Sequence, residues 1–247
     1  MDLRLVLFVA AAFLRPPMTF ADPYPGGPSP VNSSDPDRAS LAAARVRPLL
    51  QPVLVKARLQ IGDPVFIRIF KESKEFEVWM KPARDPSFRL FRSYRIASFS
   101  GSLGPKIREG DCQAPEGFYH IGKKSLNPRS AYHLSFDLGY PNDYDRAHGR
   151  TGSALMVHGK AVSIGCYAMT DDSIEQIYTL VSAALNQGQP FVRVHCFPFR
   201  LTEERLASEA ASPWRDFWKN LREGYQAFEQ THLPPEIVAL NRRYVVK

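Results

Sequence analysis

The distribution of apolar residues changes along the chain from short runs to longer amphipathic stretches. Between residues 65 and 158, β-branched and aromatic residues form short runs separated by Gly, Pro, Asn and Asp, a pattern typical of strands. The same pattern returns once later in the chain. We therefore predict strands at Val65–Phe70, Phe76–Met80, Arg92–Phe99, Gly117–Ile121, Tyr132–Leu138, Ser153–His158 and Phe191–Phe197.

Helical periodicity is found mainly after these strands. The clearest helix is Asp172–Asn186, which starts on a capping-box-like pair, Asp172 and Glu175, and ends before Gly188. Further helices are predicted at Ala39–Leu50, ending near Pro48, at Glu203–Ala211 and at Pro213–Gln230. Strands first and helices last predict an α+β fold that is mainly β, with a sheet core and C-terminal helices.

The first 21 residues have the features of a signal peptide. Leu5–Leu14 is a run of ten apolar residues after Arg4, and it is too short to span a bilayer, which needs about 20 residues. Thr19 and Ala21 place small residues at the two recognition positions of a cleavage site. We expect cleavage after Ala21 and export of the chain. The alternative is an uncleaved membrane anchor.

The remaining domain boundaries follow from composition and from the predicted elements. Residues 22–38 are rich in Pro, Gly, Ser, Asn and Asp, which predicts a semi-extended linker. A helical and connecting segment follows at 39–64 and the main domain at 65–202. Residues 203–247 are predicted to be a C-terminal helical extension.

Composition and charge limit the classes of function. Apolar residues make up 44% of the 247 residues, which excludes a wholly disordered or fibrous chain. Lys and Arg number 32 against 25 Asp and Glu, a net charge of +7. No basic run concentrates this charge, so nucleic acid is not an expected partner. A basic protein that works beside an anionic polymer or a membrane surface fits the balance.

The chain has three cysteines, Cys112, Cys166 and Cys196. An odd count in an exported protein leaves at least one free thiol unless chains pair. Cys112 lies in a polar turn and Cys196 in a predicted strand, so we interpret both as structural. They could form a disulfide with each other, but that depends on a geometry that the sequence does not contain.

The candidate chemistry lies in residues 153–172, SALMVHGKAVSIGCYAMTDD. Cys166 is predicted to precede a helix N-terminus, where free N–H groups and the helix dipole would stabilise a thiolate. His158 ends a predicted strand and could take the thiol proton as a base. Gly165 allows the backbone to approach a substrate closely. The N–H groups of Gly165, Cys166 and Tyr167 could face a developing oxyanion.

The run VHGKAVSIGCYAM at residues 157–169 resembles the active-site signature of the L,D-transpeptidase catalytic domain, also called the YkuD domain. Gly110–Tyr119, Leu126–Pro128 and Ser135–Asp145 resemble the same family. The FPFR segment at 197–200 and the Trp/Phe-rich helix after it resemble its YafK-like branch. The resemblance covers about residues 50–230 and implies a YkuD-like β-sandwich or sheet core.

The resemblance also implies roles for individual residues. Cys166 would be the nucleophile, His158 the general base and Gly159 the backbone partner that orients the imidazole. The implied substrates are peptidoglycan stem peptides, the implied location is the periplasm at the cell wall, and no cofactor or metal is implied. Two departures are a loop of only Lys160–Val162 and Ile164 where histidine is common. Both mark the YafK-like branch, which is associated with hydrolysis of peptidoglycan–protein links as well as with cross-linking.

Substrate contacts are expected from four further residues, Ser163, Arg150, Tyr119 and Asn127. Arg150 is the candidate for binding a free carboxylate of the stem peptide. The predicted activity is a transpeptidation through a thioester on Cys166. An alternative within the family is an L,D-amidase that releases a wall-linked protein or trims cross-links.

Two alternatives belong to other classes of protein. The first is a non-catalytic wall-binding module that keeps the fold, and the intact His158, Gly165 and Cys166 argue against it. The second is a zinc hydrolase. The spacing of His148, His158, Cys166 and His195 does not match standard zinc sites.

Overall fold

The computed structural model of the protein describes residues 37–247, and the predicted signal peptide and most of the predicted linker lie outside them. In this described part, no helix has the length and apolar character needed to cross a membrane. Helix α1 (Arg38–Lys56) begins at once, because the Oδ1 atom of Asp37 accepts a hydrogen bond from the Ser40 N–H group. In the described part of the chain, regular structure therefore begins at Arg38, the last residue of the predicted linker.

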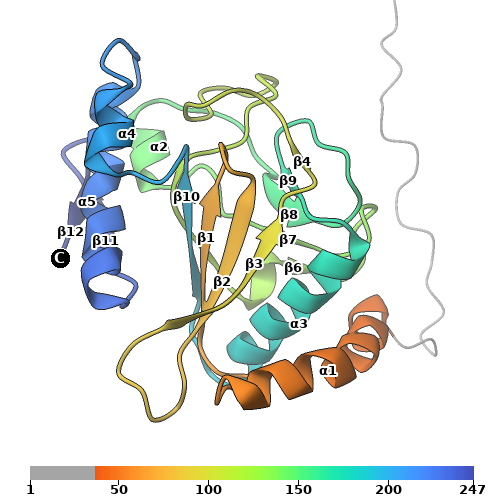
Figure 1. The fold of residues 1–247 in the computed structure, drawn as a ribbon. Coiled ribbons are helices and arrows are strands. Elements are labelled where there is room, and N and C mark those ends of the chain that lie inside the picture. The colour runs from red at the N-terminus through yellow and green to blue at the C-terminus, as the bar shows by residue number, and fades with distance from the viewer. Residues whose placement is uncertain (1–36) are drawn as a thin grey trace, which may run out of the picture. The chain divides into compact units, whose positions relative to one another are not determined.

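The first of two five-stranded sheets has the strand order β3-β2-β1-β10-β5 (Figure 1). Its strands are β1 (Val65–Phe70), β2 (Glu75–Met80), β3 (Arg89–Arg95), β5 (Gly117–Ile121) and β10 (Val192–Phe197). Only β1 and β10 run parallel to each other among these neighbours. A parallel pair needs a long connection, and helix α3 (Asp171–Asn186) lies in it, directly before β10.

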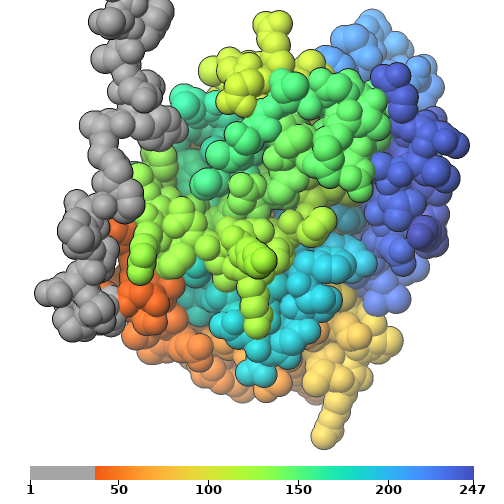
Figure 2. Space-filling view, turned by 180° about the vertical axis from the view of Figure 1, so that it is seen from behind, coloured from red at the N-terminus to blue at the C-terminus, as the bar shows by residue number. Residues whose placement is uncertain are grey.

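The second sheet is built from very short strands in the order β4-β9-β8-β7-β6. They are β4 (Ser98–Phe99), β6 (Leu126–Asn127), β7 (Ser135–Asp137), β8 (Met156–His158) and β9 (Tyr167–Ala168). The short helices η1 (Lys123–Ser125) and α2 (Asp143–Ala147) lie in the connections between them. On the reverse side of the molecule, the green segments between β5 and β9 form much of the surface (Figure 2).

Strand alternation gives the first sheet two buried faces. Along β1, Ile67 and Ile69 enter the main core, whereas Phe66 and Phe70 enter aromatic clusters on the opposite face. The main core also contains one face of the second sheet and the buried sides of α1 and α3. Helix α5 (Arg215–Thr231) packs on the aromatic side. The first sheet is therefore the middle layer of the domain.

Helix α1 is longer than predicted. It continues through Pro48 and Pro52 to Lys56 and does not end near Pro48. Both prolines face solvent, so water can hydrate the carbonyl groups that have lost their N–H donors. On the opposite side, Leu50 and Leu54 are fully buried and continue the apolar stripe of the helix. Their burial offsets the cost of the two prolines.

We predicted that the C-terminal extension, residues 203–247, is helical, but it also contains two strands. Helix α4 (Glu203–Ala207) and α5 are followed by a hairpin of β11 (Ile237–Leu240) and β12 (Arg243–Val246). The two turn residues, Asn241 and Arg242, have φ angles of 49° and 59°. A two-residue turn with positive φ at both positions follows the natural twist of the strands.

The other elements agree with the prediction, with changes at their ends. β1 and β5 have the predicted bounds, and α3 begins one residue earlier than predicted, at Asp171, with Thr170 as its N-cap. The predicted strand Arg92–Phe99 is divided between the two sheets as β3 and β4. The α+β class is confirmed.

A buried ion pair connects the first sheet to α5. Lys71 follows β1, and its Nζ atom lies 2.9 Å from Oε1 of Glu116, with neither side chain exposed. Glu116 also accepts hydrogen bonds from the Gly104 N–H group at 2.7 Å and from the Trp218 indole at 2.8 Å. Lys71 donates in addition to the carbonyl groups of Gly104 and Ala114. Each buried charge therefore has several partners, as burial of charge requires.

Replacing Glu116 by Ala leaves the Lys71 ammonium group buried without its counter-charge. We expect a loss of about 3–5 kcal/mol in the free energy of unfolding, measured by urea denaturation. Glu223→Ala, which breaks the exposed ion pair with Arg243, is the control and should cost less than about 1 kcal/mol. Equal losses in the two variants would contradict a special role for the buried pair.

Candidate active site

One face of the second sheet enters the main core and the other carries the candidate catalytic residues. The core-facing row across the strands is Phe99, Tyr167, Val157, Phe136 and Leu126. The adjacent row is Ser98, Ala168, His158, Ser135 and Asn127. Successive side chains of a strand point to opposite faces. His158 therefore lies on the face turned away from the core, and Cys166, one residue before Tyr167, lies on the same face.

Cys166 is half-buried immediately before β9, and its sulfur contacts the neighbouring main chain. The Met156 N–H group donates to Sγ at 3.4 Å, and the thiol lies 3.8 Å from the Ala154 carbonyl oxygen. Burial raises the pKa of Cys166, and the Asp137 carboxylate raises it further, while the Met156 N–H group and the Lys106 ammonium group act in the opposite direction. At neutral pH the group is therefore a neutral thiol.

The prediction that Cys166 precedes a helix N-terminus is wrong. Strand β9 follows Cys166, and α3 begins only at Asp171 with Thr170 as its cap. The effect of a helix dipole is confined to its first turn, so α3 does not supply the thiolate stabilisation that we expected. Tyr167 and Ala168 instead pair with β4 and β8.

The disulfide considered between Cys112 and Cys196 is not formed. All three cysteines are free thiols, with Cys112 exposed and Cys196 buried. Burial raises the pKa of Cys196 above its ordinary range, so this thiol is protonated and unreactive. Cys166 and Cys112 are the two thiols that solvent can reach.

His158 ends β8 and is 3% exposed. Its Nδ1 atom lies 2.6 Å from the carbonyl oxygen of Gly159. Because a carbonyl oxygen only accepts, Nδ1 carries the proton and Nε2 carries the lone pair. The Tyr132 ring packs on the imidazole with the ring centroids 4.7 Å apart. Burial lowers the pKa of His158 by more than the Gly159 hydrogen bond raises it, so the imidazole is a neutral base with Nε2 free to accept a proton.

No hydrogen bond joins His158 to Cys166 within residues 37–247. Both groups are neutral, which agrees with a resting thiol and imidazole and not with a preformed thiolate–imidazolium pair. Catalytic hydrogen bonds often shorten only when a substrate is bound.

Gly159 occupies a position with no room for a side chain. A Cβ atom there would lie 2.6 Å from Oδ1 of Asp171 and 2.8 Å from the Tyr132 carbonyl oxygen. Its N–H group donates to the carbonyl groups of Tyr132 and Leu134 at 3.0 and 3.1 Å. Asp171 also accepts from the Lys160 N–H group at 2.8 Å. This packed turn fixes the Gly159 carbonyl group that holds the imidazole.

The short loop before Cys166 is closed by Ser163. The Ser163 hydroxyl donates to the Cys166 carbonyl oxygen at 2.6 Å and accepts from the Gly165 N–H group at 3.2 Å. Gly165 has a φ angle of 146°, which residues with a side chain rarely adopt. Ser163 thus shapes the backbone around the thiol. Two apolar side chains of this loop, Val162 and Ile164, are 59% and 71% exposed.

The three amides considered for an oxyanion site differ in availability. The Gly165 N–H group already donates to Ser163. Tyr167 lies inside β9, which is paired on both sides, and strand amides in that position belong to the ladder. The Cys166 N–H group makes no hydrogen bond within the part of the chain that the structure describes. It is the amide best placed to receive an oxyanion.

Two of the expected substrate contacts belong to a buried cluster around Asp145. Arg150 donates to Oδ1 of Asp145 at 2.8 Å, and the Tyr119 hydroxyl donates to Oδ2 at 3.1 Å. Arg150 is 7% exposed, so its charge is neutralised inside the protein. Asn127, by contrast, lies in the polar row of the second sheet, and its Oδ1 atom accepts from the Arg129 N–H group at 3.0 Å.

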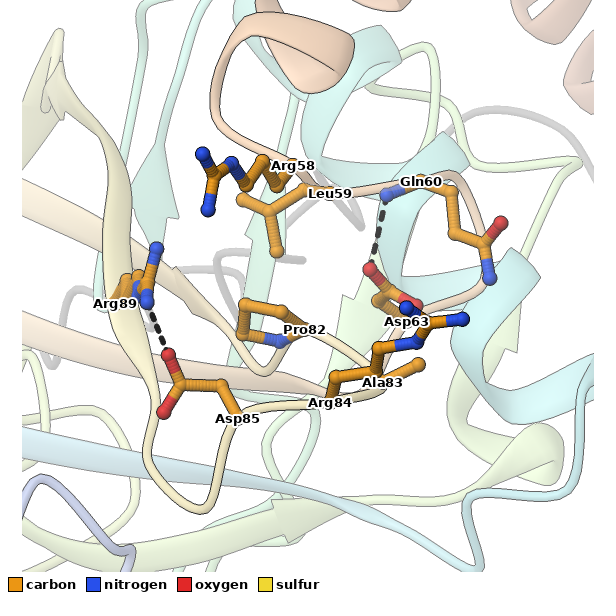
Figure 3. Close-up of a pocket in the computed structure, with 9 residues that line it drawn as sticks. All are labelled: Arg58, Leu59, Gln60, Asp63, Pro82, Ala83, Arg84, Asp85 and Arg89. Atoms are coloured by element: carbon orange, nitrogen blue, oxygen red, sulfur yellow. Dashed lines mark hydrogen bonds and ion pairs between the residues drawn. The ribbon is translucent and has the colours of Figure 1, made fainter.

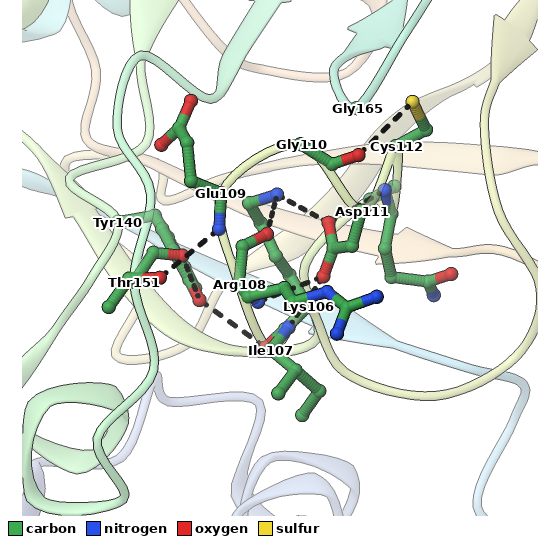
Figure 4. A network of polar contacts seen from close by, with 12 residues as sticks. Lys106, Ile107, Arg108, Glu109, Gly110, Asp111, Cys112, Tyr140, Thr151 and Gly165 are labelled. Atoms are coloured by element: carbon green, nitrogen blue, oxygen red, sulfur yellow. Dashed lines mark hydrogen bonds and ion pairs between the residues drawn. The ribbon is translucent and has the colours of Figure 1, made fainter. Parts of the chain in front are cut away.

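A polar loop at residues 102–113 lies next to Gly165, the residue before Cys166 (Figure 4). Asp111 holds the loop by accepting from three of its main-chain N–H groups, those of Ile107, Arg108 and Gln113, and from Nζ of Lys106. A Cβ atom on Gly165 would lie 3.9 Å from the Gln113 carbonyl oxygen. The loop therefore brings the Lys106 charge near the Cys166 thiol.

Sequence reasoning did not single out three residues of this site, Tyr132, Asp137 and Lys106. Asp137 could have been found, since it follows Ser135 at the two-residue spacing of one strand face. Lys106 lies in an irregular segment, where no periodicity indicates a direction, and Tyr132 lies before β7, although we predicted that it begins this strand. Their positions depend on tertiary packing.

The described part of the chain contains no metal-binding cluster: no group of three or more His, Cys, Asp or Glu residues that could hold a metal occurs within residues 37–247. A pocket of about 570 Å³ lies where the chain after α1 meets the β2–β3 loop (Figure 3). None of the candidate catalytic or substrate-binding residues lines it.

The neutral thiol should be visible in the pH dependence of alkylation. Because burial raises the pKa of Cys166, the iodoacetamide rate at Cys166 should increase through an inflection at higher pH than that of free N-acetylcysteine amide measured under the same conditions. The measurement uses a Cys112→Ser background, so that the other accessible thiol does not contribute. An inflection at or below that of the free thiol would contradict the assignment of a neutral thiol.

The packing of Gly159 can be tested by adding one methyl group. Gly159→Ala should lower the free energy of unfolding by about 1–3 kcal/mol, because the new Cβ atom collides with the turn. Gly122→Ala is a matched control at an open position and should change it by less than about 0.5 kcal/mol. Urea denaturation of both variants gives the comparison. An unchanged free energy of unfolding in Gly159→Ala would show that the turn can move to accommodate the methyl group.

Comparison with known proteins agrees with this site. The model of the L,D-transpeptidase catalytic domain, YkuD, matches residues 88–194, which include His158 and Cys166. The chain is 45% identical over 196 residues to "Putative L,D-transpeptidase YafK" of Escherichia coli, covering 79% of each protein.

Solved structures are more distant. The helical cell shape determining protein Pgp2 from Campylobacter jejuni has 17% identity and a TM-score of 0.44, covering 81% of this chain and 79% of that chain. L,D-transpeptidase 1 of Mycobacterium tuberculosis has 14% identity and a TM-score of 0.29, covering 55% and 62%. The assignment therefore rests on the family model and on the sequence relative: the chain belongs to the L,D-transpeptidase catalytic domain (YkuD) family.

Proposed function

We propose that this chain is an exported cysteine enzyme that transfers acyl groups of peptidoglycan stem peptides through a thioester on Cys166. The substrate class is supported by family membership, because L,D-transpeptidases act on peptidoglycan. Export to the periplasm is supported by the apolar run and the small residues at the start of the chain. Such a location brings the basic protein to the cell wall.

The arrangement of Cys166 and His158 carries the proposal. Cys166 immediately precedes β9 and His158 ends the neighbouring strand β8, and both side chains lie on the outer face of the second sheet. The Gly159 carbonyl group fixes the imidazole tautomer and leaves Nε2 unprotonated. A half-buried thiol and an oriented neutral base on the same face of one sheet are the two groups that nucleophilic catalysis needs.

The two neutral groups define the order of proton transfers. As Sγ of Cys166 attacks the carbonyl carbon of the peptide bond, the thiol proton moves to Nε2 of His158. The oxyanion receives a hydrogen bond from the Cys166 N–H group, and one such donor contributes about 3 kcal/mol or more to the transition state. The imidazolium then returns the proton to the leaving amine, the C–N bond breaks, and a thioester remains on Cys166.

The acceptor of the acyl group determines the product. An amine of a second stem peptide gives a cross-link, and water gives hydrolysis, including release of a protein attached to the wall. The loop beside the thiol is short and exposes Val162 and Ile164 at its surface. These apolar side chains can contact the acceptor or the leaving group.

Incubation of the protein with purified muropeptides, followed by mass spectrometry, tests the proposal. Joined peptides indicate transpeptidation and shortened peptides indicate hydrolysis. Cys166→Ala should abolish turnover, and His158→Gln should slow it by about 10²–10⁴-fold. Cys112→Ala changes an exposed thiol that the mechanism does not use and should retain most activity.

Two results would contradict the mechanism. Turnover that survives in Cys166→Ala would exclude the thioester. Muropeptide binding without any product in the unmodified protein would favour a wall-binding module.

A further inference from the structure

A second groove lies on the aromatic side of the first sheet. It is a pocket of about 400 Å³ between β5, β10 and the segment that enters β11. Its lining residues include Phe118 and His120 from β5, Arg193 and His195 from β10, and Ile237 from β11. The proposed chemistry at Cys166 does not use any of them.

His195 in this groove is a buried polar side chain that the fold does not satisfy. It is 1% exposed, and its Nδ1 atom has no hydrogen-bond partner within the described part of the chain. The ring packs between Phe66 and Phe118, with centroid distances of 4.7 Å to each. An unsatisfied buried polar atom costs about 1–3 kcal/mol, and an apolar residue would fill this place without that cost. A polar ring kept at this cost indicates a use for its other nitrogen, Nε2, which is not among the fully buried side-chain atoms that lack a partner in the described part of the chain.

The tautomer of His195 follows from the same burial. Burial lowers the pKa of His195 well below its ordinary value, and the charges of Arg68 and Arg193 lower it further, so the ring is neutral. Burying an unpaired N–H group is less favourable than burying an unpaired lone pair. The proton therefore belongs on Nε2, and His195 can donate one hydrogen bond to a ligand in the groove.

One further residue, Arg193, gives the rim of the groove a positive charge. Arg193 and His120 are direct cross-strand partners, so their side chains lie side by side on the same face as His195. The Arg193 guanidinium packs over Phe191 and makes no ion pair within residues 37–247. Glu236, the acidic residue of the rim, lies 3.5 Å from Nζ of Lys247. The groove therefore has an uncompensated guanidinium beside an apolar floor.

Strand alternation separates this groove from Cys166. Val192, Val194 and Cys196 of β10 enter the main core, so Arg193 and His195 point the other way. Cys166 lies on the far face of the second sheet, across that same core. The groove and the thiol therefore open on opposite sides of the two sheets, and one small ligand cannot contact both.

We propose that this groove is a second binding site, which holds a carboxylate group of a peptide between Arg193 and His195. The guanidinium fork matches a carboxylate, and the Nε2–H group of His195 donates to it. The aromatic floor can contact the rest of the ligand. The choice of a peptide carboxylate rests on the proposed function, because stem peptides supply that group, whereas the groove itself rests on geometry alone.

A site remote from the thiol would hold a polymeric substrate at a second point. When one part of a polymer binds in the groove, its other parts are held at a higher effective concentration near Cys166. Affinity for the polymer then increases without any new interaction at the reacting bond. The groove would then increase affinity for long peptidoglycan chains more than for single muropeptides.

The test measures binding, so that it does not depend on turnover. The full chain carrying Cys166→Ala is titrated with a purified disaccharide tetrapeptide, with the same compound amidated at its carboxylates, and with inorganic phosphate. The readouts are the dissociation constant and the NMR resonances of the His195 ring. We expect the free acid to shift the His195 resonances and the amidated form and phosphate to leave them unchanged.

In Arg193→Gln, the dissociation constant of the free-acid peptide at the groove should increase by about 10- to 100-fold. This is the usual effect of losing a hydrogen bond to a charged group. Arg95→Gln is the matched control, because Arg95 lies on β3, at the opposite edge of the same sheet. His195→Leu should weaken the same binding while the melting temperature is kept or raised, since the unsatisfied nitrogen is removed.

Three outcomes would overturn the proposal. They are unchanged His195 resonances with every compound, equal affinity of Arg193→Gln and Arg95→Gln, and binding of phosphate as strong as that of the peptide. Absence of product from the unmodified protein in the muropeptide assay is a separate result. It would contradict the proposed function, whereas binding at His195 would still be measurable.

Discussion

The second sheet has to bury one of its faces, and this constraint places the whole candidate active site. Tyr167 and Val157 are adjacent across β9 and β8, and both are fully buried in the main core. Since neighbouring positions of a strand point to opposite faces, Cys166 and His158 must then lie on the other side. A shift of one residue in this pairing would exchange the two sets. The apolar residues next to Cys166 and His158 are therefore as important for the candidate site as those two residues are.

Buried charge is handled in the same way throughout the fold, by pairing it where elements meet. Lys71 and Glu116 connect the first sheet with α5, and Asp145 neutralises Arg150 beside α2. These pairs explain why a basic residue in a functional stretch of sequence is not necessarily available to a ligand. Arg193 differs, because it has no acidic partner within residues 37–247.

Much of the fold could be predicted from sequence, because the buried faces of helices and strands require apolar residues at regular spacings along the chain. β1 is buried throughout and apolar except for Arg68, since both of its faces are covered, and α3 shows a helical stripe. Cys166 and His158 were recognised from a local motif. The helix dipole at Cys166 was predicted wrongly because Tyr167–Ala168 is too short to be recognised as a strand without its partners β4 and β8. The burial of Arg150 could not be predicted, because its ion pair with Asp145 is a tertiary contact.

The burial that keeps Cys166 protonated also bears on its survival between turnovers. Peroxides and disulfides react with the thiolate, and sulfenic acid forms most readily where a thiol has a low pKa and open access to solvent. A thiol whose pKa is raised by burial reacts slowly with such oxidants. In the mechanism that we propose, Cys166 becomes a nucleophile only when a carbonyl carbon is bound next to it and His158 takes the proton. At the exported location that we propose, the neutral thiol would therefore react slowly with oxidants until a substrate binds.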